Sequence, residues 1–262
     1  MTREGIPVHA LPVAEDRAVR PGKIPPGEVD LWYFAESHQP ALEEPYVLND
    51  LCVHAQEQAR RFVCPEDRRR FIAGRLLLQN VLARYCECEP SSLEYSTGSF
   101  GKPALSSPPS AVAAGLQFNL SRSSEVVAVA VGHMPLGLDI EKQRPVAHEQ
   151  AFLARQFSSQ EQEYVRHSLR PRAALFEIWC RKEAYLKALG LGIFHPLRKC
   201  PVSPGCTLPV FESPRGQPHL DWQLRSLNLP LPGYAAALCT PAPTPCPHLI
   251  PLSCDDLLNG IR

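Results

Sequence analysis

Two carboxylates in the segment Pro135–Glu141 stand at a spacing that suits metal chemistry. The segment reads PLGLDIE, and as a β-strand of period two it turns Asp139 and Glu141 to one face and apolar side chains to the other. Neighbouring like charges are costly unless a cation or basic side chains lie between them. Hard oxygen ligands suit Mg²⁺, which binds one or two carboxylates and completes its shell with water and phosphate. The alternative is a solvated strand face on which Lys142 and Arg144 compensate the charge.

Charged side chains also interrupt or border the apolar stripe of a predicted helix at Phe176–Gly190. Lys182 falls inside the stripe, where an amphipathic helix needs an apolar residue. Glu183 and Lys187, at positions i and i+4, share one edge of it. The ordinary interpretation is a lysine stem lying along the apolar surface beside a surface ion pair. The position of Lys182 favours the other interpretation, in which Glu183 and Lys187 face a metal–phosphate site.

Three shorter motifs contain polar side chains that could have either a structural role or a catalytic or phosphate-binding role. Ser158 and Glu161, in FSSQE, fit a helix-capping box, and this explains Glu161 as well as catalysis does. Lys102 lies in the loop FGKP, and Arg122 lies between two serines ahead of a buried strand. Such loops supply hydrogen-bond donors to phosphate oxygens, although each of them also occurs in ordinary turns.

The elements that must position these residues alternate between strands and helices. Apolar runs and period-two patterns predict strands at Val29–Phe34, Leu93–Ser96, Glu125–Val131, Leu136–Glu141, Trp222–Leu229 and Tyr234–Cys239. Helical spacing predicts helices at Asn49–Phe62, Pro65–Tyr85, Phe157–Leu169 and Ala173–Leu189. The order β, α, α, β, β in both parts indicates two similar halves, 29–132 and 133–239. Proline-rich ends flank them, an N-terminal arm at 1–28 and a tail at 240–262.

Composition excludes several functional classes. The chain has 262 residues with 27 basic and 27 acidic side chains, so it lacks the basic excess of a general nucleic-acid binder. No apolar run reaches the roughly 20 residues that span a bilayer, and Met1–Pro26 contains no apolar core of a secretory signal. The ten cysteines form no C-x-x-C pair, which predicts reduced thiols. We therefore expect a cytoplasmic protein that binds neither nucleic acid nor membrane.

Taken in order, the motifs RRFVCPEDRRRFIAGRLLL, FGKP, FNLS, GLDIE, FSSQE and WCRKEAYLKALGLGI resemble the 4′-phosphopantetheinyl transferases, in particular the surfactin-type group. GLDIE followed by W-x-x-KEA-x-x-K is the specific part of this pattern. The resemblance implies two similar α+β subdomains related by a pseudo-twofold axis, with coenzyme A in the cleft between them. It also implies a magnesium-dependent enzyme of the holo-[acyl-carrier-protein] synthase type. Such an enzyme moves 4′-phosphopantetheine from coenzyme A to a serine of an apo carrier protein and releases adenosine 3′,5′-bisphosphate.

By this resemblance, the magnesium ligands are Asp139, Glu141 and Glu183. Lys187 corresponds to a lysine near the pyrophosphate and would offset the charge of the leaving group. The base that takes the serine proton is either Glu161 or Glu183, the latter through a water on the metal. The sequence leaves both bases open.

Further positions match residues that contact the coenzyme, namely Arg75, Lys102 and Ser121. Arg122 departs from the family pattern, which usually has a histidine here. Arginine stays charged and offers a planar fork of donors, so we interpret Arg122 as a ligand of the coenzyme 3′-phosphate. The alternative is that Arg122 points to solvent and that Lys102 and Arg75 bind this phosphate alone.

The resemblance leaves the partner open among apo acyl, peptidyl and aryl carrier proteins, which serve fatty-acid, polyketide and nonribosomal-peptide synthesis. A phosphoanhydride hydrolase with the same carboxylates is one rival, and it would form product without an acceptor. A non-catalytic binding relative is the other, although it would be expected to have lost a carboxylate or lysine that is present here. A chain with two similar halves already provides the pairing that a dimer of smaller subunits would provide, so we expect a monomer.

Overall fold

The computed structural model describes residues 23–35, 45–98, 100–192, 195–202 and 221–259. Its strands are β1 (Val29–Ala35), β2 (Glu94–Thr97), β3 (Pro103–Ser107), β4 (Gln117–Ser123), β5 (Val126–Gly132), β6 (Gly137–Lys142), β7 (Trp222–Leu227), β8 (Tyr234–Pro241) and β9 (His248–Leu252). Its α-helices are α1 (Pro45–Asn49), α2 (Val53–Arg60), α3 (Pro65–Cys86), α4 (Pro109–Ala113), α5 (Glu149–Gln156), α6 (Ser159–His167), α7 (Pro171–Leu189) and α8 (Cys254–Asn259). Short 3₁₀ turns lie at Pro90–Ser92 and Leu197–Lys199.

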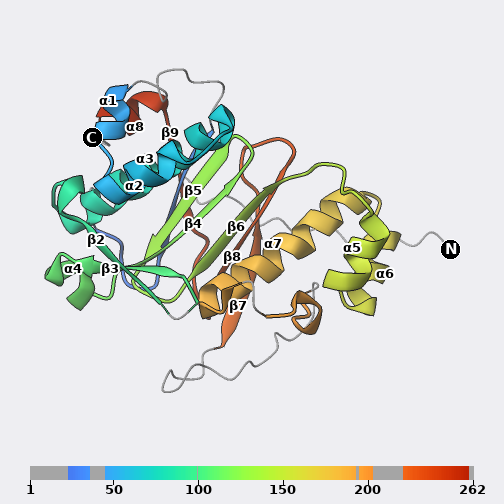
Figure 1. Ribbon diagram of the computed structural model, residues 1–262. Helices are drawn as coiled ribbons and strands as arrows, with labels where there is room; N and C mark the ends of the chain where they lie inside the picture. Colours follow the sequence, from blue (N-terminus) through green and yellow to red (C-terminus); the bar gives the residue numbers. More distant parts are fainter. Residues whose placement is uncertain (1–22, 36–44, 99, 193–194, 203–220, 260–262) are drawn as a thin grey trace.

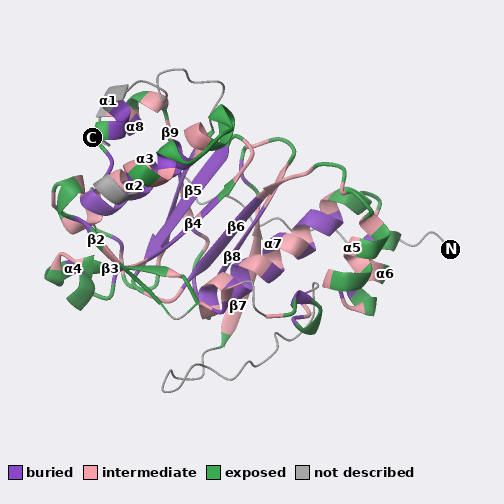
Figure 2. Ribbon diagram, in the orientation of Figure 1, coloured by how far each residue is buried: buried purple, intermediate pink, exposed green. Residues whose placement is uncertain are grey.

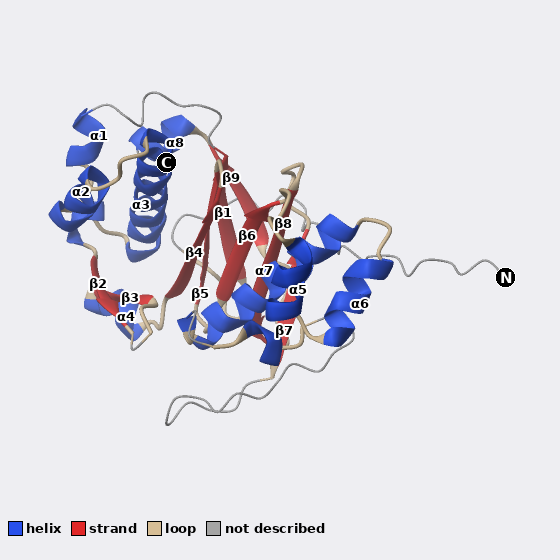
Figure 3. Ribbon diagram, turned by 45° about the vertical axis from the view of Figure 1, so that its right-hand side comes forward, coloured by secondary structure: helices blue, strands red, loops and turns tan. Residues whose placement is uncertain are grey.

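Two sheets share an apolar core, and a long helix covers the outer face of each (Figures 1 and 3). The first sheet has the strand order β4-β5-β1-β9 and lies against α3. The second has the order β6-β8-β7 and lies against α7. A separate two-stranded sheet joins β2 and β3. The α+β class predicted from the sequence is confirmed by this arrangement.

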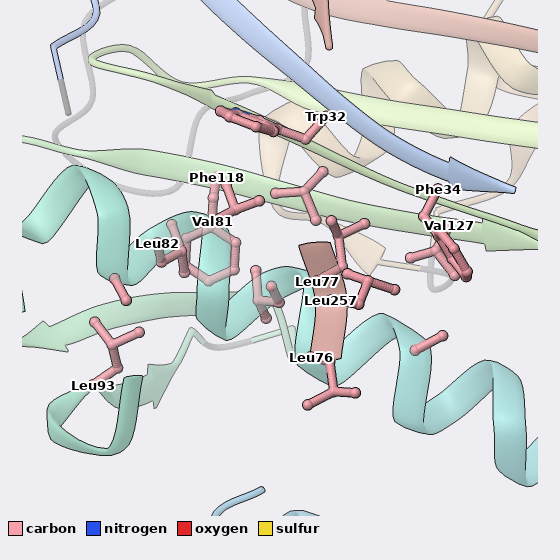
Figure 4. Close-up of a cluster of buried hydrophobic side chains, with 14 of the residues drawn as sticks. Trp32, Phe34, Leu76, Leu77, Val81, Leu82, Leu93, Phe118, Val127 and Leu257 are labelled. Carbon is pink, nitrogen blue, oxygen red and sulfur yellow. The ribbon is translucent and has the colours of Figure 1, made fainter. Parts of the chain in front are cut away.

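The continuous apolar run of β5 has a partner on each side, as expected for a strand buried on both faces. Val127, Val129 and Val131 pack toward α3, whereas Ala128 and Ala130 pack into the core between the sheets. Figure 2 shows the resulting buried band through both sheets. Figure 4 shows the α3 side of it, where α3 leucines meet aromatic side chains of the first sheet.

Helix α3 begins at the predicted Pro65 and α7 ends at the predicted Leu189, whereas α7 begins at Pro171, two residues before the predicted start. Each has proline in its first turn, where the missing N–H costs no hydrogen bond. Helix α7 ends at Gly190, whose φ of 69° favours glycine. Helix α3 ends at Glu87, which also takes a left-handed conformation. In the described residues, no helix has both the length and the apolar character needed to cross a bilayer.

Gly137, at the start of β6, lets this strand touch α7 backbone to backbone. A Cβ atom at Gly137 would lie 2.0 Å from the carbonyl oxygen of Ala184 and 2.3 Å from the amide nitrogen of Ala188. Backbone atoms cannot give way as a flexible side chain does. The close approach brings the α7 side chains Glu183 and Lys187 onto the face of β6 that carries Asp139.

We expect Gly137→Ala to cost about 3 kcal/mol or more of unfolding free energy, because overpacking already costs about 1–3 kcal/mol where side chains can yield. The matched control is Gly74→Ala in α3, where a Cβ atom would make ordinary contacts of 3.8–4.0 Å. This control should be neutral or stabilising by about 1 kcal/mol. Urea unfolding of both variants measures the difference, and equal stability would contradict the close contact.

The C-terminal segment corrects the prediction of a proline-rich tail at 240–262. Strand β9 pairs in parallel with β1, and α8 lies against α3, where Asn80 donates to the carbonyl of Leu257 over 2.9 Å. Leu257 is buried. Pro251 is tolerated because β9 is an edge strand of its sheet. Most of the predicted arm at 1–28 lies outside the described residues.

Smaller differences concern helix boundaries. The single helix predicted at Asn49–Phe62 is two helices, α1 and α2. The helix predicted from Phe157 begins at Ser159, after its capping residue Ser158. Helix α5 had no counterpart in the prediction. The cysteines in the described part of the chain are free thiols, in agreement with the expected reduced state.

Candidate active site

Side chains from β4, β6 and α7 line one pocket of about 320 Å³. Its lining consists of Leu120, Ser121, Arg122, Asp139, Glu141, Trp179, Glu183 and Lys187. Six of these residues were predicted from the sequence as site residues. The alternation of β6 presents both of its carboxylates to α7, and the i, i+4 spacing of Glu183 and Lys187 presents them to β6. The pocket therefore lies where the two sheets and α7 meet.

Asp139 has one satisfied and one unsatisfied carboxylate oxygen. Its Oδ1 accepts hydrogen bonds from Lys187 Nζ over 2.6 Å and from Ser121 Oγ over 3.0 Å. Its Oδ2 is buried and has no hydrogen-bond partner among the residues that the structure describes. A buried carboxylate oxygen without a partner is rare in native proteins and calls for a ligand.

The other two carboxylates are half-buried and destabilised in their charged forms. Burial is the main cause that raises the pKa of Glu141, and the hydrogen bond of 2.5 Å from Ser123 Oγ opposes it. Burial also raises the pKa of Glu183, and the nearby charge of Asp139 adds to the effect. A cation bound between the three carboxylates would remove this cost.

The donor set of the pocket fits Mg²⁺ as an open site. Within the described ranges, no group of three or more His, Cys, Asp or Glu side chains stands close enough together to form a ready-made cage that could hold a metal ion. Magnesium does not require such a cage, because it binds a few carboxylates and keeps water and phosphate as its other ligands. The unsatisfied Asp139 oxygen and the raised pKa values of Glu141 and Glu183 agree with this chemistry.

Lys187 is tied to β6. Its Nζ contacts Asp139, donates to the carbonyl of Leu138 over 3.1 Å and donates to Ser121 Oγ over 3.1 Å. About a quarter of the side chain remains accessible from the pocket, at 28%. The ammonium is thus placed at the pocket wall, beside the unsatisfied oxygen of Asp139.

Glu161 lies outside this pocket, in a fully buried ion pair. Its Oε2 is 2.8 Å from Lys182 Nζ, and both side chains have 0% exposure. The capping box with Ser158 is confirmed, and Glu161 Oε1 accepts from the amide of Val202 over 2.9 Å. Lys182 also donates to the carbonyls of Leu197 and Cys200. These contacts give Lys182 a structural explanation, contrary to the functional one that its place in the stripe suggested.

Lys102 is half-buried, and its ammonium lies among carbonyl groups. Its Nζ donates to the carbonyl of Leu136 over 2.9 Å and lies 3.5 Å from that of Ala188. Burial lowers the pKa of Lys102 to about 8. The side chain does not line the carboxylate pocket and instead fastens the FGKP loop to β6 and α7.

The two predicted arginines share one aromatic ring. The guanidinium carbons of Arg75 and Arg122 lie 5.3 Å and 5.7 Å from the centroid of Phe71. Burial, followed by the nearby charge of Arg75, lowers the pKa of Arg122. Two cations held this close favour an anion between or beside them.

A second pocket, of about 360 Å³, shares Arg122 and Glu141 with the first. Its lining consists of Phe62, Asp67, Arg70, Arg122, Ser123, Ser124, Glu141, Lys142 and Arg144. Sequence reasoning missed Arg70 as a site residue because a run of arginines on a helix ordinarily indicates solvated surface. Lys142 and Arg144 were considered only as charge compensation. Their positions next to the two carboxylates of β6 could have indicated that they belong to the site.

The geometry defines a two-sheet α+β protein with a carboxylate–lysine pocket beside a basic pocket, which suits a transferase acting on a phosphorylated substrate. Comparison with known proteins agrees with this class. Residues 135–239 match the model of the 4′-phosphopantetheinyl transferase superfamily, and residues 37–133 match that of the 4′-phosphopantetheinyl transferase N-terminal region. The two matched regions adjoin at residues 133–135.

Individual relatives point the same way. The chain is 36% identical over 169 residues to the 4′-phosphopantetheinyl transferase HetI of Nostoc sp., covering 63% of this chain and 70% of the relative. It is 30% identical over 212 residues to psf-1 of Bacillus pumilus, covering 78% and 84%. It is 32% identical over 146 residues to Sfp of Bacillus subtilis, covering 54% and 61%.

The chain therefore belongs to the 4′-phosphopantetheinyl transferase family, in its surfactin-type group. Members of this family transfer phosphopantetheine from coenzyme A to a serine of a carrier protein. The resemblance and the activity predicted from the sequence motifs are confirmed.

Proposed function

We propose that the transfer takes place in the pocket between β4, β6 and α7, with Mg²⁺ held by Asp139, Glu141 and Glu183. The buried Asp139 oxygen without a hydrogen-bond partner is the observation that carries this proposal. When bound, the ion would neutralise the coenzyme pyrophosphate and orient it for displacement. Removal of divalent ions with a chelator, followed by stepwise return of Mg²⁺, tests the assignment. Full activity in the chelated enzyme would overturn it.

In this proposal the carrier serine oxygen attacks the phosphorus that bears pantetheine, and the phosphoanhydride bond breaks. Adenosine 3′,5′-bisphosphate leaves with the bonding electrons, and the Lys187 ammonium at the pocket wall offsets its growing charge. The two candidate bases differ in position. Glu183 lines the pocket and has a raised pKa, whereas Glu161 is buried outside it against Lys182. We therefore assign the serine proton to Glu183.

The basic pocket would hold the phosphate groups farther from the reacting phosphorus. Arg122 lines both pockets, and Arg75 lies near the same Phe71 ring as Arg122. In this proposal Arg122 binds the 3′-phosphate of a coenzyme whose pyrophosphate lies at the carboxylates, and its place in the lining of both pockets supports this. Ser121 and Lys102 act in this scheme through the protein contacts described above.

Arg122→Ala should raise the KM for coenzyme A by an amount equivalent to about 1.5–3 kcal/mol, the usual worth of a hydrogen bond to a charged group. The KM for 3′-dephospho-coenzyme A should stay nearly unchanged. Arg68→Ala is the matched control, since this α3 arginine lines neither pocket. Equal losses on both substrates would place Arg122 on the pyrophosphate instead, and no loss on either would make it a surface residue.

The partners and the assembly follow from the same proposal. We infer a cytoplasmic monomer that acts on apo acyl, peptidyl or aryl carrier proteins, with its two halves related by a pseudo-twofold axis. In support, each half contributes a sheet covered by one long helix, and both sheets share one core. Sedimentation at micromolar concentration tests the monomer, and a mass near twice 29.1 kDa would contradict it.

A further inference from the structure

Strands β4 and β6 belong to different sheets, yet side chains of β4 bond to the backbone of β6 at every second residue. Asn119 Oδ1 accepts from the amide of Leu138 over 2.8 Å. Ser121 Oγ accepts from the amide of Ile140 over 3.2 Å. Ser123 Oγ accepts from the amide of Lys142 over 3.1 Å. The three side-chain oxygens thus stand where the carbonyls of a neighbouring strand would stand. We call these three residues the seam ladder.

Two members of the seam ladder also bond to the carboxylates. Ser121 Oγ donates to Asp139, and Ser123 Oγ donates to Glu141 Oε2 over 2.5 Å. A hydroxyl has one proton and two lone pairs. Each proton goes to a carboxylate, since the β6 amides can only donate. Each serine hydroxyl therefore accepts a hydrogen bond from a backbone amide of β6 and donates one to a side-chain carboxylate of β6.

Glu141 depends on this arrangement more than Asp139 does. Asp139 is also held by Lys187, which contacts Oδ1. In the part of the chain that the structure describes, the hydrogen bond from Ser123 is the one that reaches the Glu141 carboxylate. Without it, the half-buried Glu141 side chain would be free to adopt other rotamers, and the two β6 carboxylates would lose their common orientation.

We propose that Ser123 is a positioning residue that orients Glu141, and that the seam ladder holds the carboxylate strand against the first half of the protein. The ladder itself rests only on the observed contacts. The effect of Ser123 on the metal rests on the proposed magnesium site. Ser123 was noted in the sequence only as a neighbour of Arg122, because its partner is 18 residues away in the chain.

The test uses the full chain with Ser123→Ala and Ser123→Thr, and Ser96→Ala as a control that removes an exposed strand hydroxyl. Mn²⁺, which accepts the same oxygen ligands as Mg²⁺, is titrated by electron paramagnetic resonance with coenzyme A present and carrier protein absent. Loss of a partner that orients a ligand typically weakens metal binding by about 10-fold or more. We expect this loss in Ser123→Ala, recovery to within about 3-fold in Ser123→Thr, and no change in Ser96→Ala.

A second readout is independent of the metal. Hydrogen exchange of the Lys142 amide, measured by NMR, should be at least about 10-fold faster in Ser123→Ala, because this amide loses its acceptor. Unchanged amide protection together with unchanged Mn²⁺ affinity would overturn the proposal. Failure of threonine to restore Mn²⁺ affinity would also overturn the orienting role. Absence of Mn²⁺ binding by the wild-type protein would instead contradict the magnesium site, with the ladder still judged by amide exchange.

Discussion

Asp139→Ala is expected to abolish phosphopantetheine transfer, with a loss of about a thousandfold or more, while the protein stays folded. A preorganised charge in an active site contributes about 10²–10³ in rate, and here the same side chain would also hold the metal. The fold should survive because Lys187, its partner, is partly accessible and can be hydrated after the substitution. The rate is measured at saturating Mg²⁺ and coenzyme A, and folding is followed by circular dichroism.

A second variant separates charge from shape. Asp139→Asn keeps the volume of the side chain and its ability to bond Ser121, yet removes the negative charge. It should be inactive as well. Substantial activity in Asp139→Asn at saturating Mg²⁺ would show that the charge is dispensable and would contradict the assignment of Asp139 as a magnesium ligand.

Glu161→Gln is expected to destabilise the protein by about 3–5 kcal/mol, because it leaves the buried Lys182 ammonium without its counter-ion. Urea unfolding at neutral pH measures this loss. The double variant Glu161→Leu with Lys182→Met removes both charges and should recover much of the stability, since the two residues are coupled. Activity per folded molecule should stay within about tenfold of wild type, which is less than loss of a general base would cost.

The same pair of measurements decides between the candidate bases. A stable but inactive Glu161→Gln protein would make Glu161 the catalytic base and overturn its structural role. A destabilised protein that still transfers phosphopantetheine would leave Glu183 as the base.

The sequence predicted those parts of the site that lie within single elements. Period two in β6 placed Asp139 and Glu141 on one face, and helical spacing placed Glu183 and Lys187 on one edge of α7. Both expectations agree with the pocket. Helix ends were predicted correctly only where a local proline or glycine marks them, as at Pro65 and Gly190.

The sequence could not predict contacts between segments that are distant in the chain. The position of Lys182 was taken to favour a functional site because the sequence does not show its ion-pair partner. That partner, Glu161, lies on another helix, 21 residues earlier in the chain. Lys102 was expected at the coenzyme, yet its ammonium bonds carbonyls of the second half. Strand β9 was taken for a tail because prolines normally argue against a strand, and only the edge position explains its exception.

The most direct test is the incubation of the protein with coenzyme A, Mg²⁺ and a panel of apo acyl, peptidyl and aryl carrier proteins, followed by intact mass measurement. We expect at least one carrier to gain the mass of a single phosphopantetheinyl group on its serine, with adenosine 3′,5′-bisphosphate formed in equal amount. The gain should disappear with Asp139→Ala. Release of adenosine 3′,5′-bisphosphate without any acceptor, and with every carrier unmodified, would contradict the transfer reaction and identify a hydrolase.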